Sequence, residues 1–227
     1  MSTPNAQSLA AGEPVHAPIV LASASPRRHA LLARAGVAFE ARPAHVDESP
    51  RSGEAPEETL ARVARAKAVA VADAIAERGR LVLGADTGVV LDGVLFGKPR
   101  NAEHAIEMLA HLAGRTHRVI TEVAVAESRG GRAWQCRATS FVTLRAAARE
   151  ELARYVAGGE PLDKAGAYAF QGEGRVFVSR VEGSETNVIG LPLEETLALL
   201  ACARAALASF AQRAAGFAQR AEGERRP

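Results

Sequence analysis

The chain has 227 residues, of which 48% are hydrophobic and 24% are charged, and its formal net charge is +2. This composition is ordinary for a globular protein, and the length allows one large domain or one domain with two lobes. The small net charge argues against a nucleic-acid surface, and the aromatic content of 4% argues against platforms that stack single-stranded bases. No apolar run approaches the length of a membrane span, so we expect neither nucleic acid nor a membrane as partner.

Three segments are expected along the chain. Residues 1–17 have neither the basic nor the apolar region of a secretion signal, so we expect a mobile extension there. Residues 18–205 are expected to form a single domain with two lobes, and 206–227 a helical tail that frays at its end. Cys136 and Cys202 lie far apart without metal-type spacing, which favours reduced thiols and a cytoplasmic location.

The first ordered stretch places two arginines at the start of a helix. Residues 19–22 are apolar and predict a buried strand, and residues 26–35 predict a helix that ends at Gly36. The N-terminus of a helix carries partial positive charge, so Arg27 and Arg28 are unfavourable in the first turn unless they bind a partner or reach solvent. Together with serine hydroxyls and free backbone N–H groups they favour an anion site, most simply for phosphate. The alternative is a capped surface helix whose arginines reach solvent.

The next two segments add acids and a lysine. A strand-like segment at 37–42 leads into Asp47 and Glu48, which form either part of a site or an ordinary polar turn. Residues 55–78 predict a long helix, and Lys67 falls inside its apolar stripe. An unpaired buried ammonium is costly, so we expect Lys67 to face a partner in a cleft. The alternative is that its stem snorkels to the surface.

A hairpin follows, with an Asp-Gly turn at 92–93. An apolar strand delivers Asp86 and Thr87, and counting outward from the turn pairs Thr87 with Lys98. Strict pleating sends Asp86 to the other face, so we expect a bend or bulge within 84–88 to bring the acid and the lysine together. The alternative is an edge hairpin whose end charges form a weak surface ion pair.

The remaining chain alternates between helix and strand, which favours an α/β fold. We expect a helix at 101–113, strands at 116–125 and 138–144, a helix at 146–156, a loop at 160–172, a strand at 175–181, a loop at 183–187 and a final helix from 192. The loop at 160–172 contains Asp163, Lys164 and Gln171. Gln171 donates and accepts at once and could read the edge of a nucleobase, whereas the alternative is a turn with a local ion pair.

Eight short motifs lie in order within residues 19–200. They are Leu-Ala-Ser-x-Ser-Pro-Arg-Arg at 21–28, Asp-Glu at 47–48, Gly-Ala-Asp-Thr at 84–87, Gly-Lys-Pro at 97–99, Leu-x-Gly-Arg-Thr-His at 112–117, Pro-Leu-Asp-Lys-Ala-Gly-Ala-Tyr at 161–168, Gln-Gly at 171–172 and Gly-Leu-Pro-Leu at 190–193. With these motifs the chain resembles the Maf family of nucleoside triphosphate pyrophosphatases. It departs from the family pattern at Glu122, Phe170 and Glu185, which affects fine substrate preference.

The resemblance implies a fold, a reaction and roles for residues. The fold is α/β: a twisted mixed sheet flanked by helices, in an elongated two-lobed Maf/ITPase-like architecture with a central cleft, and members are often homodimers. The reaction is hydrolysis of dTTP and UTP to the monophosphate and pyrophosphate, which clears nucleotide pools. The implied roles are Asp86, Lys98 and Glu48 in catalysis; Ser23, Arg28, Lys67, Asp163 and Lys164 in substrate binding; Arg27, Thr87 and Gln171 in base selection; and Glu48 and Asp86 as ligands of a divalent metal cation, Mg²⁺ or Mn²⁺.

Three other functions are distinguishable from this one. The second family branch takes 7-methyl-GTP or related nucleotides and tends to carry an aromatic residue, a Gln and a Glu where this chain has Arg27, Thr87 and Gln171. A non-catalytic nucleotide-binding regulator of cell division is a further alternative, which the intact acids and lysine disfavour. A P-loop or Nudix hydrolase is disfavoured because neither a Gly-rich Lys-Ser/Thr loop nor a Glu-rich Nudix helix is present.

Overall fold

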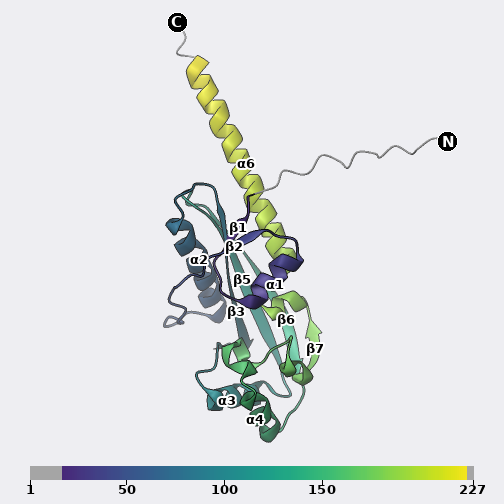
Figure 1. Cartoon of the computed structure of the whole chain (residues 1–227). Helices are drawn as coiled ribbons and strands as arrows, with labels where there is room; N and C mark the ends of the chain where they lie inside the picture. Colours follow the sequence, from purple (N-terminus) through teal and green to yellow (C-terminus); the bar gives the residue numbers. More distant parts are fainter. Residues whose placement is uncertain (1–16, 224–227) are drawn as a thin grey trace, which may run out of the picture.

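The computed structural model describes residues 17–223, and within them one seven-stranded mixed sheet is flanked by helices (Figure 1). The strands are β1 (Ile19–Leu21), β2 (Phe39–Ala41), β3 (Leu81–Leu91), β4 (Val94–Phe96), β5 (Thr116–Glu127), β6 (Ala133–Leu144) and β7 (Val178–Glu182). The helices are α1 (Pro26–Arg34), α2 (Pro56–Ala74), α3 (Ala102–Leu112), α4 (Arg149–Ala157), α5 (Glu185–Ile189) and α6 (Leu193–Gly223). Three short 3₁₀ helices are η1 (Glu160–Asp163), η2 (Ala165–Ala167) and η3 (Glu173–Phe177).

The sheet order is β2-β1-β3-β5-β6-β7, and β4 pairs with the far end of β3. The β2–β1 and β1–β3 pairs are parallel, whereas the pairs from β3 onward are antiparallel. The long strands β3, β5 and β6 run through the whole body and give it an elongated shape (Figure 1). The α/β class with a mixed sheet, predicted from the alternating pattern and the resemblance, is confirmed.

One face of the sheet carries two separate hydrophobic clusters. Odd-numbered residues of β3 and β5 point to this face, because side chains alternate along a strand. The upper cluster packs these strands against α1 and α6 and includes Leu31, Leu32, Leu83, Val123, Leu191 and Leu200. The lower cluster packs them against α3 and α4 and includes Val89, Leu109, Val119, Leu152, Tyr155 and Phe177. Thr87 and Thr121 lie between the buried residues of the two clusters, and the partly buried Phe170 packs against both.

Helix α2 covers the opposite face and approaches β3 very closely. Gly84 makes this approach possible, because a Cβ there would lie 2.5 Å from the Ala64 carbonyl oxygen and 2.7 Å from the Ala68 backbone nitrogen. Gly88 provides a second gap, where a Cβ would lie 2.5 Å from Leu95 Cδ1 and 3.1 Å from Leu60 Cδ2 of α2. Asp86 lies between these two glycines on the same face, directly beneath α2.

The hairpin differs from its prediction in two ways. Counting outward from the turn also pairs Leu91 with Val94 and Val89 with Phe96, and both pairs are present. The β3–β4 ladder ends at the Val89–Phe96 pair, so Lys98 is not a partner of Thr87. The expected bend or bulge is also wrong, because β3 pairs with β5 without a register shift from Leu81 to Val90. The glycines at 84 and 88 serve the close packing of α2 and not a bend of the strand.

Several other helix and strand boundaries in the structure differ from the predicted ones. Helix α2 ends at Ala74 rather than at 78, and α4 begins at Arg149 rather than at 146. The strand expected at 175–181 is confirmed from Val178 onward as part of β7, but its first residues belong to η3. The loop expected at 183–187 contains α5. Ser184 accepts a hydrogen bond from the Asn187 backbone N–H and so caps α5.

The two ends of the chain are described only in part. Residues 1–16 of the expected N-terminal extension and residues 224–227 of the expected frayed end lie outside the described residues. Helix α6 continues from Leu193 to Gly223, so the boundary expected near 205 falls inside a helix. Within residues 17–223, every helix is either too short or too polar to cross a lipid bilayer.

Candidate active site

A pocket of about 1120 Å³ opens between the two lobes, and all eleven residues expected at the site line it. They come from six separate parts of the chain: Ser23, Arg27, Arg28, Glu48, Lys67, Asp86, Thr87, Lys98, Asp163, Lys164 and Gln171. This agrees with the expectation of one cleft that gathers the early arginines, the hairpin and the late loop.

The pocket forms where one edge of β3 changes partners. On this edge β3 pairs with β1 at Val82 and Leu83, and with β4 only from Val89 onward. The residues between, Asp86 and Thr87, border the pocket. Since they are neighbours on a regular strand, they enter the pocket from opposite faces of the sheet.

On the α2 face, one lysine holds two carboxylates. Lys67 Nζ lies 2.9 Å from Asp86 Oδ1 and 2.8 Å from Glu48 Oε1. The Lys67 side chain is 9% exposed and that of Asp86 17%, whereas Glu48 is 53% exposed. Burial raises the pKa of Asp86 above its ordinary value, although Lys67 and Arg28 act in the opposite direction. The prediction that Lys67 faces a partner in a cleft is confirmed by these contacts.

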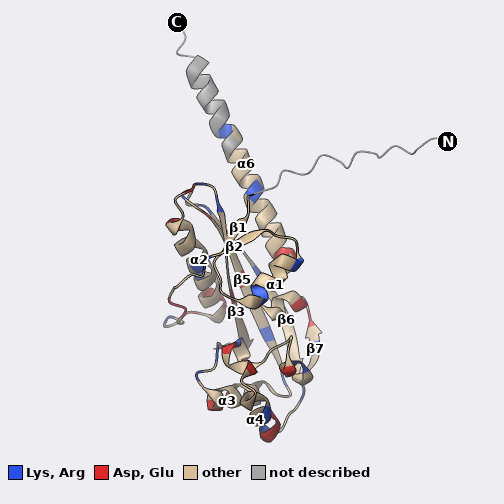
Figure 2. Ribbon diagram, in the orientation of Figure 1, with Lys and Arg blue, Asp and Glu red and all other residues tan. Residues whose placement is uncertain are grey.

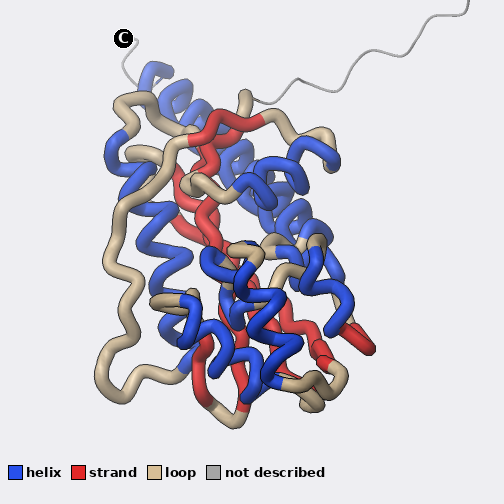
Figure 3. Tube along the Cα trace, turned by 60° about the horizontal axis from the view of Figure 1, so that its bottom comes forward, coloured by secondary structure: helices blue, strands red, loops and turns tan. Residues whose placement is uncertain are grey.

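The loop that carries Glu48 is fastened to α2 beside this cluster. It connects β2 to α2 and runs along the outside of the helix (Figure 3). Arg62 of α2 forms a bidentate pair with Glu54 at 2.6 and 2.7 Å and donates to the Ser49 carbonyl at 2.8 Å. Hydrogen bonds from Arg62 lower the pKa of Glu54 to about 2, so this pair stays charged at neutral pH. Arg62 therefore fixes the position of the loop that presents Glu48.

On the opposite face, Arg28 is held by a network that spans the chain. Its guanidinium donates to the Gly190 carbonyl at 2.9 Å, to Thr87 Oγ1 at 3.1 Å and to Ser23 Oγ at 3.3 Å. Thr87 Oγ1 in turn lies 2.9 Å from Thr121 Oγ1 across the β3–β5 pair. The Thr87 hydroxyl thus orients Arg28, and Figure 2 shows the basic start of α1 near the middle of the molecule. Arg28 therefore turns into the pocket and not to solvent, and the anion site remains a prediction.

The late loop supplies the remaining charges of the pocket. Arg27 Nη1 lies 3.6 Å from Asp163 Oδ2, and Asp163 also pairs with Lys164. Lys98 lines the same pocket, and the Gly97 carbonyl beside it accepts a hydrogen bond from Gly166 N–H at 3.1 Å. The chain after the hairpin is thereby joined to the late loop, which brings Lys98 to the pocket without a ladder pair.

Sequence reasoning missed several residues that support the site. Asn187 is buried and donates from Nδ2 to the Val119 carbonyl at 2.9 Å and to Ser140 Oγ at 3.0 Å. It thereby fastens α5 to β5 and β6 just before Gly190. Ser184 is a favourable N-cap residue and Glu185 a favourable first-turn residue, and this local signal could have indicated α5. For Arg62, Tyr155 and Glu160, the local sequence held no such signal.

Comparison with known proteins identifies the family of the chain. The family model described as Maf-like protein matches residues 18–203. A dTTP/UTP pyrophosphatase of Methylococcus capsulatus is 51% identical over 182 residues, which are 80% of this chain and 89% of the relative. The proteins of the same name from Myxococcus xanthus and Escherichia coli O157:H7 are 51% and 48% identical, over 80% of this chain and 90% and 91% of theirs. On the family model and these relatives, the chain belongs to the Maf family.

Proposed function

We propose that this protein is a nucleoside triphosphate pyrophosphatase that hydrolyses dTTP and UTP to the monophosphate and pyrophosphate. The observation that carries the proposal is the single pocket in which Arg28, Lys67, Asp86 and Lys98 meet. The relatives named dTTP/UTP pyrophosphatase support the nucleotide assignment. Both cysteines are free, which is consistent with the proposed cytoplasmic location.

The triphosphate is proposed to lie in the pocket at the edge of β3, between Arg28 on one face of the sheet and the Lys67–Asp86 pair on the other. Arg28, with Ser23 beside it, would bind phosphate oxygens from the α1 side, and Lys98 and Lys164 from the hairpin and the late loop. Cations fixed in this way neutralise the charge of the phosphates and of the pyrophosphate that leaves. Arg28 is already held by three hydrogen bonds, so little reorganisation is needed when the nucleotide binds.

Asp86 is proposed to orient the attacking water and accept its proton. Lys67 fixes one oxygen of the Asp86 carboxylate, which leaves the other oxygen for the water. The raised pKa of Asp86 increases its affinity for the proton it would receive. Arg27, Thr87 and Gln171 are proposed to select the pyrimidine, and Thr87 in addition orients the phosphate-binding Arg28 through a hydrogen bond.

Glu48 and Asp86 fit a divalent metal of the Mg²⁺ or Mn²⁺ type. Lys67 Nζ contacts one oxygen of each carboxylate and so occupies the point between them. The ion would be held by their other oxygens, because hard cations prefer carboxylate, phosphate and water oxygens. When bound, such an ion would neutralise phosphate charge. Two protein carboxylates suffice, because Mg²⁺ keeps several waters and takes further ligands from the substrate.

The test compares Asp86→Asn with Asp92→Asn, which makes the same change in the exposed hairpin turn beside Arg115. Pyrophosphate release is measured over a panel of nucleotides that includes dTTP, UTP, CTP, GTP and 7-methyl-GTP, with Mg²⁺, Mn²⁺ or EDTA. We expect Asp86→Asn to lose at least about 10³-fold in kcat while it still binds UTP, and Asp92→Asn to match the unchanged chain. Equal pyrophosphate release by the two variants would refute the role of Asp86, and preference for 7-methyl-GTP would refute the pyrimidine assignment.

A further inference from the structure

The segment that carries Gln171 is fastened at both of its ends. At its far end, the Glu160 carboxylate accepts hydrogen bonds from the backbone N–H groups of Glu173 at 3.1 Å and Gly174 at 3.0 Å. At its near end, the Tyr155 hydroxyl accepts a hydrogen bond from the Ala169 backbone N–H at 3.0 Å. We refer to residues 169–174 as the base loop.

The base loop lies unusually close to these two side chains. A Cβ on Gly172 would lie 1.7 Å from Glu160 Oε1, and a Cβ on Gly174 would lie 2.6 Å from the Tyr155 hydroxyl oxygen. Only glycine at both positions permits the observed approach. The two glycines and the two side chains that hold the loop are therefore structurally coupled.

Glu160 is suited to this contact at neutral pH because it is ionised. Burial acts to raise the pKa of Glu160, but hydrogen bonds from Gly174, Tyr155 and Glu173 outweigh it, and the pKa is lowered. An ionised carboxylate only accepts hydrogen bonds, which is what two facing backbone N–H groups require. Both carboxylate oxygens are occupied by the base loop, so Glu160 acts on a ligand through that loop.

We propose that Glu160, together with Tyr155, is a positioning residue that sets the nucleobase selectivity of the pocket. Phe170 and Gln171 of the base loop line the pocket, and Tyr155 does not. Glu160 also borders the pocket, but both of its carboxylate oxygens accept hydrogen bonds from backbone N–H groups of the loop. A glutamine amide distinguishes one base from another only if its backbone is fixed, because the amide donates and accepts and can turn. The inference rests on the proposed function, since it concerns the selectivity of the same site.

The test measures kcat and KM for UTP and CTP in Glu160→Gln. The amide has one oxygen, so its NH₂ group would face a backbone N–H and one of the two bonds would be lost. We expect the ratio of kcat/KM for UTP to that for CTP to fall about tenfold, through a higher KM for UTP, with kcat nearly unchanged. Tyr155→Phe removes the other fastening point and is expected to shift the ratio in the same direction.

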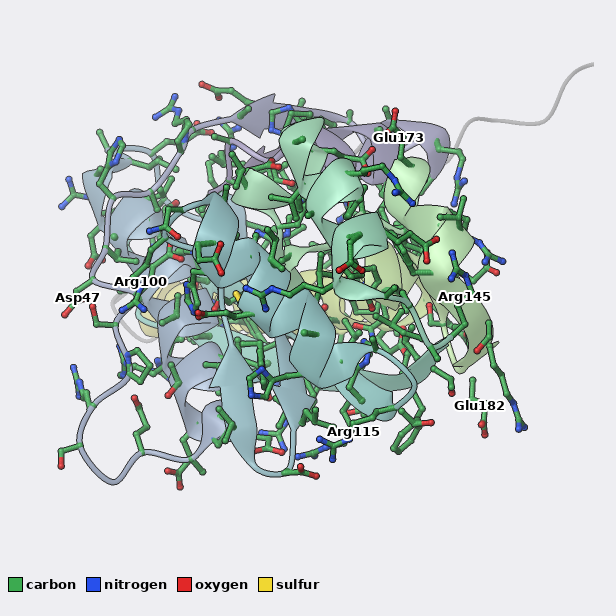
Figure 4. The ribbon with its side chains drawn as sticks, turned by 90° about the horizontal axis from the view of Figure 1, so that it is seen from below. Asp47, Arg100, Arg115, Arg145, Glu173 and Glu182 are labelled. Carbon is green, nitrogen blue, oxygen red and sulfur yellow. The ribbon has the colours of Figure 1, made fainter. Side chains whose placement is uncertain are left out.

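Glu173→Gln is the matched control, because it removes the same charge from the base loop itself. Among residues 17–223 the Glu173 side chain makes no hydrogen bond or ion pair, and it lies at the outside of the molecule (Figure 4). We expect its UTP-to-CTP ratio to equal that of the unchanged chain. If Glu160→Gln does not fold, Tyr155→Phe carries the comparison.

Three results would overturn the inference: an unchanged ratio in folded Glu160→Gln and Tyr155→Phe, an equal loss of kcat for both nucleotides, or the same shift in Glu173→Gln. If the unchanged chain prefers a nucleotide other than dTTP or UTP, the proposed function is contradicted but the role of Glu160 is not. In that case the same variants are compared on that nucleotide and CTP, and a selective rise in KM still supports the role of Glu160.

Discussion

His117 illustrates at the scale of one residue how burial converts a titratable group into a structural one. Its side chain is 2% exposed, and Nε2 lies 2.8 Å from the hydroxyl oxygen of Tyr168, which lines the pocket. Burial lowers the pKa of His117 to about 4, from an ordinary value of 6.5. The unfolded chain therefore takes up a proton between pH 6.5 and 4 that the folded chain does not, and the free energy of unfolding falls as the pH is lowered through this window.

We predict a loss of about 3 kcal/mol in the free energy of unfolding from this residue between pH 6.5 and 4. Urea unfolding is measured at intervals of pH in the unchanged chain and in His117→Gln, whose amide can bond to Tyr168 but does not titrate. The advantage of the unchanged chain over His117→Gln in the free energy of unfolding should decrease as the pH falls from 6.5 to 4. Parallel curves would show that His117 is not the group responsible.

Single residues were predicted well where one physical cost decides. Lys67 in an apolar helix stripe had to find a carboxylate, and it contacts two. Arg27 and Arg28 at a helix start had to serve an anion site or solvent, and Arg28 turns inward. The hydrogen bond from the Thr87 hydroxyl to the Gly190 carbonyl could not be foreseen, because Gly190 lies far along the chain.

At the scale of elements, the packing of α2 on β3 depends on Gly84. We predict that Gly84→Ala lowers the free energy of unfolding by about 2 kcal/mol, because the new Cβ meets backbone atoms of α2 that move only with the helix. The displacement of α2 would also move Lys67 away from Asp86 and lower kcat. Gly97→Ala is the control for stability, since a Cβ there meets nothing within 4 Å. Equal urea midpoints for the two variants would contradict the prediction.

Elements were predictable where their signals are local. Asn101 caps α3, Pro26 begins α1, and the Asp-Gly turn fixes the register of the hairpin. The glycines of β3 were misread as a bend because their reason is the backbone of α2, which no local pattern reveals. The short helix α5 was missed because a five-residue helix shows little periodicity.

At the scale of the whole molecule, the two lobes share β3, β5 and β6. We predict that they unfold together, although their hydrophobic clusters are separate. Leu152→Ala in the lower cluster should lower stability by about 3 kcal/mol. Trp134 packs against the upper cluster, and its fluorescence should report the same lowered midpoint as far-UV circular dichroism. The surface variant Val94→Ala serves as control, and a Trp134 transition unmoved by Leu152→Ala would show that the lobes unfold separately.

The arrangement of the whole was the least predictable level from residues alone. Hydrophobic periodicity predicted alternating strands and helices, but the order β2-β1-β3-β5 joins segments that are distant in sequence. The convergence of the arginines, the hairpin and the late loop was expected mainly from the family resemblance. Each motif by itself also had an ordinary structural interpretation.

The alternation of Asp86 and Thr87 along β3 has an evolutionary consequence. The acid proposed to activate water belongs to one face of the strand, and the threonine that orients Arg28 belongs to the other. Substitutions at Thr87 would therefore alter the placement of Arg28 during evolution while the Lys67–Asp86 pair on the other face is inherited unchanged. Deletion of one residue upstream in the strand would turn each of the two side chains to the opposite face, and both the Lys67–Asp86 pair and the Thr87–Arg28 hydrogen bond would be lost.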